Sequence, residues 1–153
     1  MPNKTIEMRP IGIVRTAVPD DTVAGSRRNI ISRIVIDEPY AEALLGIDAY
    51  SHLFVLFWLD RQTSGGARVY HPRGDSELPL TGVLASRGRN HPNPIGLAVV
   101  ELIEYRNPEL IVRRLDAFDG TPVLDIKPYD HYDRVLEPRV PPWFLKRAMT
   151  AGE

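Results

Sequence analysis

His52-Leu-Phe-Val-Leu-Phe-Trp-Leu59 is apolar at every position after its histidine. It lacks the alternation of apolar and polar residues that is typical of a strand with one face in water. We therefore expect a strand that is buried on both faces and lies at the centre of the core. Asp60 and Arg61 follow where this strand ends.

Strand-like runs occur on both sides of this segment, and turn residues separate them. Fourteen prolines and eleven glycines cut the chain into short pieces. Several short strands with turns between them favour a mostly β protein, an antiparallel barrel or sandwich. Besides Ser51–Leu59, the expected strands are Ile11–Arg15, Ile30–Asp37, Thr81–Ala85, Leu97–Glu104, Glu109–Leu115 and Pro122–Lys127.

The pattern predicts one short helix. Pro39 suits its first turn, and Gly46 supplies a stop. One apolar face is formed by Tyr40, Ala43, Leu44 and Ile47. The segment from Arg61 to Leu80 reads as a long loop, and residues 131–153 read as an extended C-terminal tail. We expect one domain over residues 1–153.

Composition narrows the possible functions. The chain has 153 residues, a net charge of −1, 43% hydrophobic residues and no cysteine. Disulfides and thiolate metal sites are therefore excluded, and four scattered histidines lack metal-site spacing, so we expect no metal. No run is long enough to span a bilayer and no signal-peptide core is present, which predicts a cytoplasmic protein without membrane attachment.

The segment Ala85-Ser-Arg-Gly-Arg-Asn-His-Pro-Asn-Pro-Ile-Gly-Leu97 joins two expected strands. Pro92 and Pro94 restrict the residues before them to extended conformations. Gly96 removes a side chain where another group approaches the backbone closely. The segment is either a rigid, solvated surface loop or a preformed ligand-binding loop.

A second segment, Leu115–Tyr129, concentrates carboxylates. Asp119-Gly120 is a hairpin-turn signal, so a plain turn is one interpretation. The other is that Asp116, Asp119 and Asp125 accept hydrogen bonds from a ribose or an amino group. The arginines of the first loop, residues 85–97, would then bind the negative charge of a zwitterionic ligand that carries a nucleoside.

Five ordered motifs resemble the TsaA-like (TrmO) family of S-adenosylmethionine-dependent tRNA methyltransferases. The resemblance runs over about residues 9 to 130. The motifs are Pro10-Ile-Gly-Ile-Val-Arg15, Gly46-Ile-Asp-Ala-Tyr-Ser-His-Leu53, Gly82-Val-Leu-Ala-Ser-Arg87, Pro92-Asn-Pro-Ile-Gly96 and Asp119-Gly-Thr-Pro-Val-Leu-Asp-Ile-Lys-Pro-Tyr129.

This resemblance implies a small β-barrel that binds S-adenosylmethionine and works as a homodimer. It also implies methyl transfer to N6 of threonylcarbamoyladenosine beside the tRNA anticodon. The longer bacterial members have a C-terminal domain, for which this chain is too short. Carried over by motif, the cofactor residues are Arg87, Leu97, Leu59, Asp60, Leu115 and Asp116, with Gly25, Ser26 and Arg27 on a loop that closes over the cofactor.

The chain departs from the family at Arg89, where members usually have proline, and at His91, where they have arginine. We expect the substrate to be contacted by Arg89, His91, Asn93, Asp119, Thr121 and Asp125. The candidate general bases are His91, Asp119 and Asp125, and no catalytic residue is assigned. Arg113 and Arg114 are further candidates for tRNA contacts. Alternative functions are methylation of a small molecule and a non-catalytic, cofactor-binding regulatory module.

Overall fold

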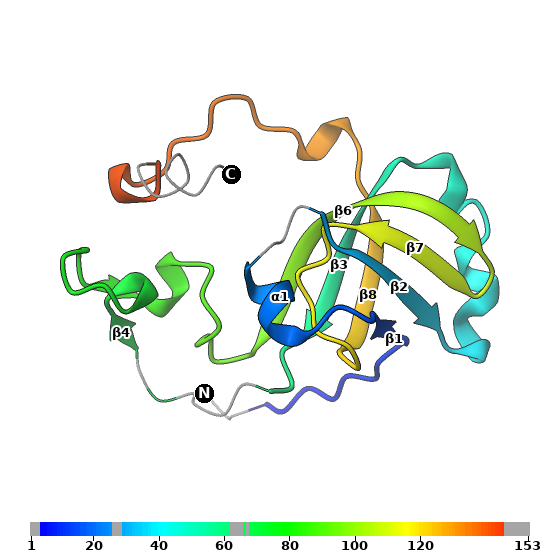
Figure 1. Ribbon diagram of the computed structural model, residues 1–153, viewed down its shortest axis with the longest axis horizontal. Helices are drawn as coiled ribbons and strands as arrows, with labels where there is room; N and C mark the ends of the chain where they lie inside the picture. Colours follow the sequence, from blue (N-terminus) through cyan, green and yellow to red (C-terminus); the bar gives the residue numbers. More distant parts are fainter. Residues whose placement is uncertain (1–3, 26–28, 62–65, 67, 146–153) are drawn as a thin grey trace.

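A closed antiparallel β-barrel forms the body of the protein. The computed structural model describes residues 4–25, 29–61, 66 and 68–145. Six strands close the barrel in the order β1-β2-β7-β6-β3-β8 (Figure 1). This confirms the predicted fold class. The strands are β1 (Gly12–Arg15), β2 (Ile31–Ile36), β3 (His52–Trp58), β6 (Ile95–Arg106), β7 (Glu109–Arg113) and β8 (Pro122–Pro128).

β3 lies between β6 and β8, as expected for the central strand. Its burial, however, differs on its two faces. Leu53, Val55 and Phe57 are buried in the barrel, whereas Phe54, Leu56 and Trp58 on the outer face are only half-buried. The prediction of two buried faces is therefore wrong for a single chain.

The interior is filled by alternate residues of every strand, because successive side chains of a strand point to opposite faces. The barrel closes around aliphatic side chains with no exposed surface, and this burial is the main source of stability. The fully buried members are Val14, Ile34, Leu53, Val55, Val100, Leu110, Val112, Leu115 and Val123.

A buried aromatic ring explains the glycine at the second position of β6. Gly96 pairs with Phe57 of β3. A Cβ at Gly96 would lie 2.2 Å from the Phe57 ring. The group expected to approach this glycine closely is therefore the phenyl ring, which is 3% exposed. Glycine here serves core packing.

The predicted short helix is a 3₁₀-helix. It spans Glu38–Leu44 (η2) and is followed by η3 (Ile47–Ala49). Of the expected apolar face, Leu44 and Ile47 are buried, whereas Tyr40 and Ala43 are exposed. Gly46 separates the two at φ 89°, a left-handed conformation that favours glycine. The sequence did not predict the six-residue helix α1 (Asp20–Gly25).

The segment expected to be a long loop contains regular structure. β4 (Val69–Tyr70) pairs with β5 (Thr81–Gly82), and η4 (Pro72–Gly74) lies between them. Only two residues of the expected strand Thr81–Ala85 are extended, since Val83–Ala85 form η5. In Figure 1 β4 lies to the left of the barrel and away from it.

The described part of the tail is mostly extended and exposed. One short 3₁₀ turn, η6 (His131–Asp133), follows β8, and its N-terminus is capped by the Asp130 side chain. Residues 134–141 have no regular structure, and residues 142–145 form a helical turn. In the described residues, no helix has the length and apolar character needed to cross a bilayer.

Candidate functional site

Three segments that carry predicted site residues meet at the end of β3. We call them the three-segment site: residues 59–61, 85–97 and 115–121. The Leu59 N–H donates to the Pro94 carbonyl (2.7 Å), which ties the end of β3 to the first loop. The Arg61 guanidinium donates to the Asp119 carbonyl (2.9 Å), which ties it to the Asp-Gly turn. The fold thus joins segments far apart in the sequence.

Arg87 and Leu97 are brought into contact. Arg87 Nη2 donates to the Leu97 carbonyl (3.0 Å), and both side chains are exposed. This bond fixes the guanidinium at the entrance of β6 while using one of its five N–H donors. Arg87 is therefore oriented and still able to bind a carboxylate through two donors.

His91 holds its own loop together. Its Nε2 lies 2.8 Å from the Ser86 carbonyl, and because a carbonyl only accepts, Nε2 carries the proton. The Ser86 hydroxyl in turn hydrogen-bonds with the Tyr70 hydroxyl of β4. His91 is half-buried, and Asn93 beside it is exposed. These bonds tie the two ends of the loop to each other and to β4, and Nε2 of His91 is not available as a base in this arrangement.

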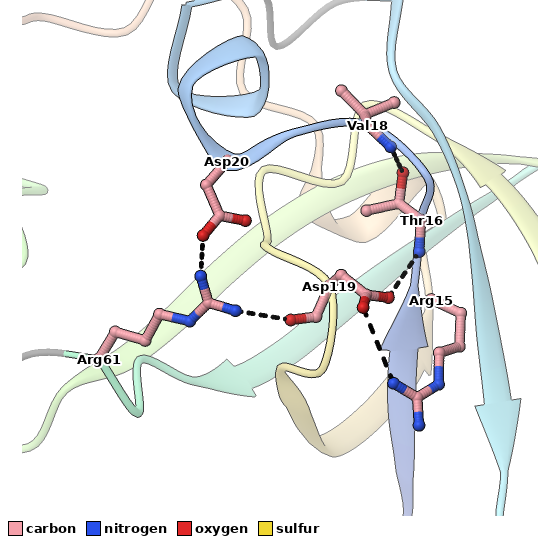
Figure 2. A network of polar contacts seen from close by, with 6 residues as sticks. All are labelled: Arg15, Thr16, Val18, Asp20, Arg61 and Asp119. Atoms are coloured by element: carbon pink, nitrogen blue, oxygen red, sulfur yellow. Dashed lines mark hydrogen bonds and ion pairs between the residues drawn. The ribbon is translucent and has the colours of Figure 1, made fainter.

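Asp119 anchors the turn to β1. Its Oδ1 accepts from the Thr16 N–H (3.0 Å), and its Oδ2 lies 3.9 Å from Nη1 of Arg15 (Figure 2). The Gly120 N–H also donates to the Val14 carbonyl (2.8 Å), and Gly120 has φ 84°. The Asp-Gly turn is thus confirmed, and the carboxylate is engaged in holding it. The turn closes no hairpin, however, because β7 and β8 on either side of it are not paired.

Arg61 connects this turn to α1. Its Nη2 donates to the Asp119 carbonyl, and its Nη1 pairs with the Asp20 carboxylate at the start of the helix (Figure 2). Gly25 ends that helix, so Arg61 positions the segment that leads into the predicted cofactor loop. Ser26 and Arg27 lie outside the described residues.

The other predicted residues take different places. Asp60 and Asp116 are exposed at the three-segment site. Leu115 is fully buried in the core, so only its main chain remains for a ligand. Thr121 is also buried, with 4% of its surface exposed. Asp125 lies on the outer face of β8 and pairs with Lys127 (3.0 Å). Its carboxylate therefore does not join those of Asp116 and Asp119.

The paired arginines of β7 also separate. Arg113 pairs with Glu101 of β6 (2.9 Å), whereas Arg114 is exposed just beyond the strand, at φ 76°. Among the described residues, Arg113 is the one of the two that forms an ion pair, which fits the expectation that adjacent residues face opposite ways.

Sequence reasoning missed Phe118 and Arg61. The Arg61 and Arg89 guanidinium carbons lie 5.1 and 5.8 Å from the centroid of the Phe118 ring. Phe118 is half-buried and Arg89 is exposed. The only signal in the sequence was an aromatic residue directly before a turn.

A hollow beside this site shares Asp119 with it. An open hollow of about 300 Å³ is lined by Arg15, Thr16, Ala17, Arg33 and Asp119, and Asp119 is its only predicted site residue. In the described parts of the chain, no three histidine or carboxylate side chains are grouped so that they could hold a metal ion.

The fold defines a class, the small closed antiparallel barrels, and in this chain three loop segments gather at the end of the central strand. The model of the tRNA-methyltransferase O N-terminal domain family matches residues 15–133. The chain belongs to this family, as the five motifs predicted.

Individual relatives agree with this assignment. An S-adenosyl-L-methionine-binding protein of Archaeoglobus fulgidus is 40% identical over 125 residues, which cover 80% of this chain and 88% of the relative. The tRNA (adenine(37)-N6)-methyltransferase of Escherichia coli is 35% identical, over 82% of this chain and 58% of the enzyme.

A crystal structure of TrmO superposes with a TM-score of 0.74 at 30% identity, over 91% of this chain and 66% of that one. The chain thus spans 58% of the Escherichia coli enzyme and 66% of the TrmO structure.

Proposed function

We propose that this protein is an S-adenosylmethionine-dependent methyltransferase that acts on N6 of threonylcarbamoyladenosine beside the tRNA anticodon. The observation that carries the proposal is the meeting of the end of β3, the 85–97 loop and the 115–121 turn in a member of this family. We place the protein in the cytoplasm because its proposed substrate is there.

The residues of the three-segment site suit this cofactor. S-adenosylmethionine has a carboxylate, an amino group and a ribose, and it supplies a methyl group on a positively charged sulfur. Arg87 binds the carboxylate, since its guanidinium is held in place and keeps free donors. Asp60 and Asp116, both exposed, accept hydrogen bonds from the amino group or the ribose. Leu59 and Leu97 contact the apolar parts.

Positioning is the main contribution of the protein to the reaction. Methyl transfer from a sulfonium is an in-line displacement, which is accelerated by holding donor and acceptor in line. Two of the candidate bases are already engaged, Asp119 by Thr16 and Arg15 and Asp125 by Lys127. His91 donates from Nε2 to the Ser86 carbonyl, which leaves Nδ1 as its basic nitrogen. The acceptor N6 is attached to a carbonyl, so it releases its proton more readily than an amine does. We assign no general base.

A homodimer explains why the outer face of β3 is apolar although it is only half-buried in a single chain. The register places Trp58 beside Ile95, Leu56 beside Leu97 and Phe54 beside Val99. The three residues of β6 remain 40 to 49% exposed, so an apolar patch two strands wide faces outward. Such patches mark protein interfaces. An apolar strand buried on both faces is what the sequence predicts, and a second copy of the chain supplies the missing cover.

We therefore expect Val99→Asp to separate the dimer. Its side chain is 41% exposed beside Phe54 at one end of the patch, where a charge would be buried without a partner in the interface. Light scattering after size exclusion should report one chain for the variant and two for the wild type. Ile31→Asp is the matched control, because Ile31 is 48% exposed on the outer face of β2. Equal masses for wild type and Val99→Asp would contradict this interface.

The proposed activity is tested with S-adenosylmethionine labelled in its methyl group. We expect calorimetry to show binding of the cofactor, and incubation with bulk tRNA to transfer label into RNA. Absence of binding would contradict the shared premise of every function considered. Label in small molecules alone would indicate a small-molecule methyltransferase. Binding without any transfer would indicate a regulatory module.

A further inference from the structure

An aromatic ring and two arginines come together at the three-segment site. The Phe118 ring lies in the 115–121 turn, and the guanidinium carbons of Arg61 and Arg89 are 5.1 and 5.8 Å from its centroid. Both distances fall within the range of cation–π contacts. The end of β3, the 85–97 loop and the Asp-Gly turn therefore share this ring.

The two arginines are held in different ways. Arg61 also donates to the Asp119 carbonyl and pairs with Asp20, as Figure 2 shows. Arg89 is exposed, and its guanidinium lies over the ring without an ion pair to another described residue. Arg61 is thus fixed against Phe118, whereas Arg89 can leave the ring and keeps its N–H donors for another group.

We propose that Phe118 is a stacking subsite for an unpaired base of the RNA substrate. The base takes the place of the Arg89 guanidinium on the ring, and Arg89 turns to a neighbouring phosphate. Base–aromatic stacking is stronger than an exposed cation–π contact, so the exchange is favourable. This inference rests on the proposed function, because it assigns part of the same substrate to the site.

The chemistry of the subsite determines what it recognises. A phenyl ring offers no hydrogen bond, so it accepts any base that is unpaired and able to stack. Arg89 adds one phosphate contact, which is independent of sequence and sensitive to salt. The subsite therefore orients single-stranded RNA beside the cofactor residues and does not choose the base.

The first test is steady-state methylation of a tRNA anticodon stem-loop. Phe118→Leu keeps an apolar side chain and removes the ring, so KM for the RNA should rise about tenfold. The affinity for S-adenosylmethionine should stay unchanged, and Phe118→Trp should restore the low KM. Arg89→Ala should raise KM and lower the slope of log affinity against log salt by about one.

Tyr132→Leu is the matched aromatic control, since Tyr132 is 97% exposed in η6. Arg106→Ala is the arginine control at the far end of β6, where the guanidinium is held by both oxygens of Glu104 and lowers the pKa of that carboxyl. Neither change should alter KM. An unchanged KM for Phe118→Leu would overturn the proposal. Weakened cofactor binding in that variant would also overturn it, because the ring would then serve the cofactor.

A second measurement separates the subsite from the proposed activity. Fluorescence anisotropy should show that the wild type binds single-stranded oligoadenylate more tightly than the same backbone without bases. Phe118→Leu should abolish that difference. If it does so in a protein that transfers no methyl group, the subsite stands and the proposed function fails. If methylation is seen but the bases make no difference to binding, the subsite is wrong and the function stands.

Discussion

Arg87→Ala should weaken the binding of S-adenosylmethionine by about tenfold to a hundredfold, the range for losing a hydrogen bond to a charged group. Arg87 is oriented by its bond to the Leu97 carbonyl and presents its remaining donors at the three-segment site. Isothermal calorimetry measures the change directly. The fold should survive, because the Arg87 side chain is exposed and outside the core.

Arg33→Ala provides the control for this result. Arg33 is also an exposed arginine with one partner, Glu109 (2.8 Å), but it lies on β2, outside the three-segment site. Its replacement should leave the cofactor affinity unchanged. An Arg87→Ala protein that binds the cofactor as tightly as the wild type would show that the site is placed wrongly.

Gly96→Ala should lower the free energy of unfolding by about 1–3 kcal/mol, as overpacking of a core does. The new Cβ would lie 2.2 Å from the Phe57 ring, which is buried between β3 and β6. This penalty outweighs the ~0.5–1 kcal/mol that alanine gains over glycine in a strand. Thermal unfolding should show a midpoint about 3–10 °C lower.

Gly82→Ala is the matched change in β5, where a Cβ would lie 3.9 Å from the Arg68 carbonyl oxygen. That distance is ordinary van der Waals contact, so this variant should be as stable as the wild type or slightly more so. Phe57→Leu combined with Gly96→Ala should recover part of the loss, because the two sites are in contact. A Gly96→Ala protein of unchanged stability would contradict the packing described here.

The barrel was predictable because its strands are short, apolar and separated by turn residues. The central position of β3 followed from its lack of polar residues. Its half-buried outer face did not, since a sequence does not distinguish burial within one chain from burial against a second copy. The Asp119-Gly120 turn was predicted because the left-handed conformation at Gly120 limits the residues that fit there.

The short helices and the contacts at the three-segment site were harder to predict from the sequence. The segment Glu38–Leu44 has the apolar spacing of a helix, but it forms 3₁₀ structure. α1 has six residues, too few for a recognisable period. Among the predicted site residues, Arg87 and Leu97 come from neighbouring motifs, and the fold joins them by a hydrogen bond. The Phe118 contacts with Arg61 and Arg89 depend on tertiary folding, so no spacing in the sequence indicated them.

The most direct test of the central claim is nucleoside mass spectrometry after methyl transfer. tRNA that carries threonylcarbamoyladenosine is incubated with the protein and labelled S-adenosylmethionine, then digested to nucleosides. We predict a threonylcarbamoyladenosine that is heavier by one labelled methyl group on its N6. Recovery of this nucleoside without label, from a protein that binds the cofactor, would contradict the account.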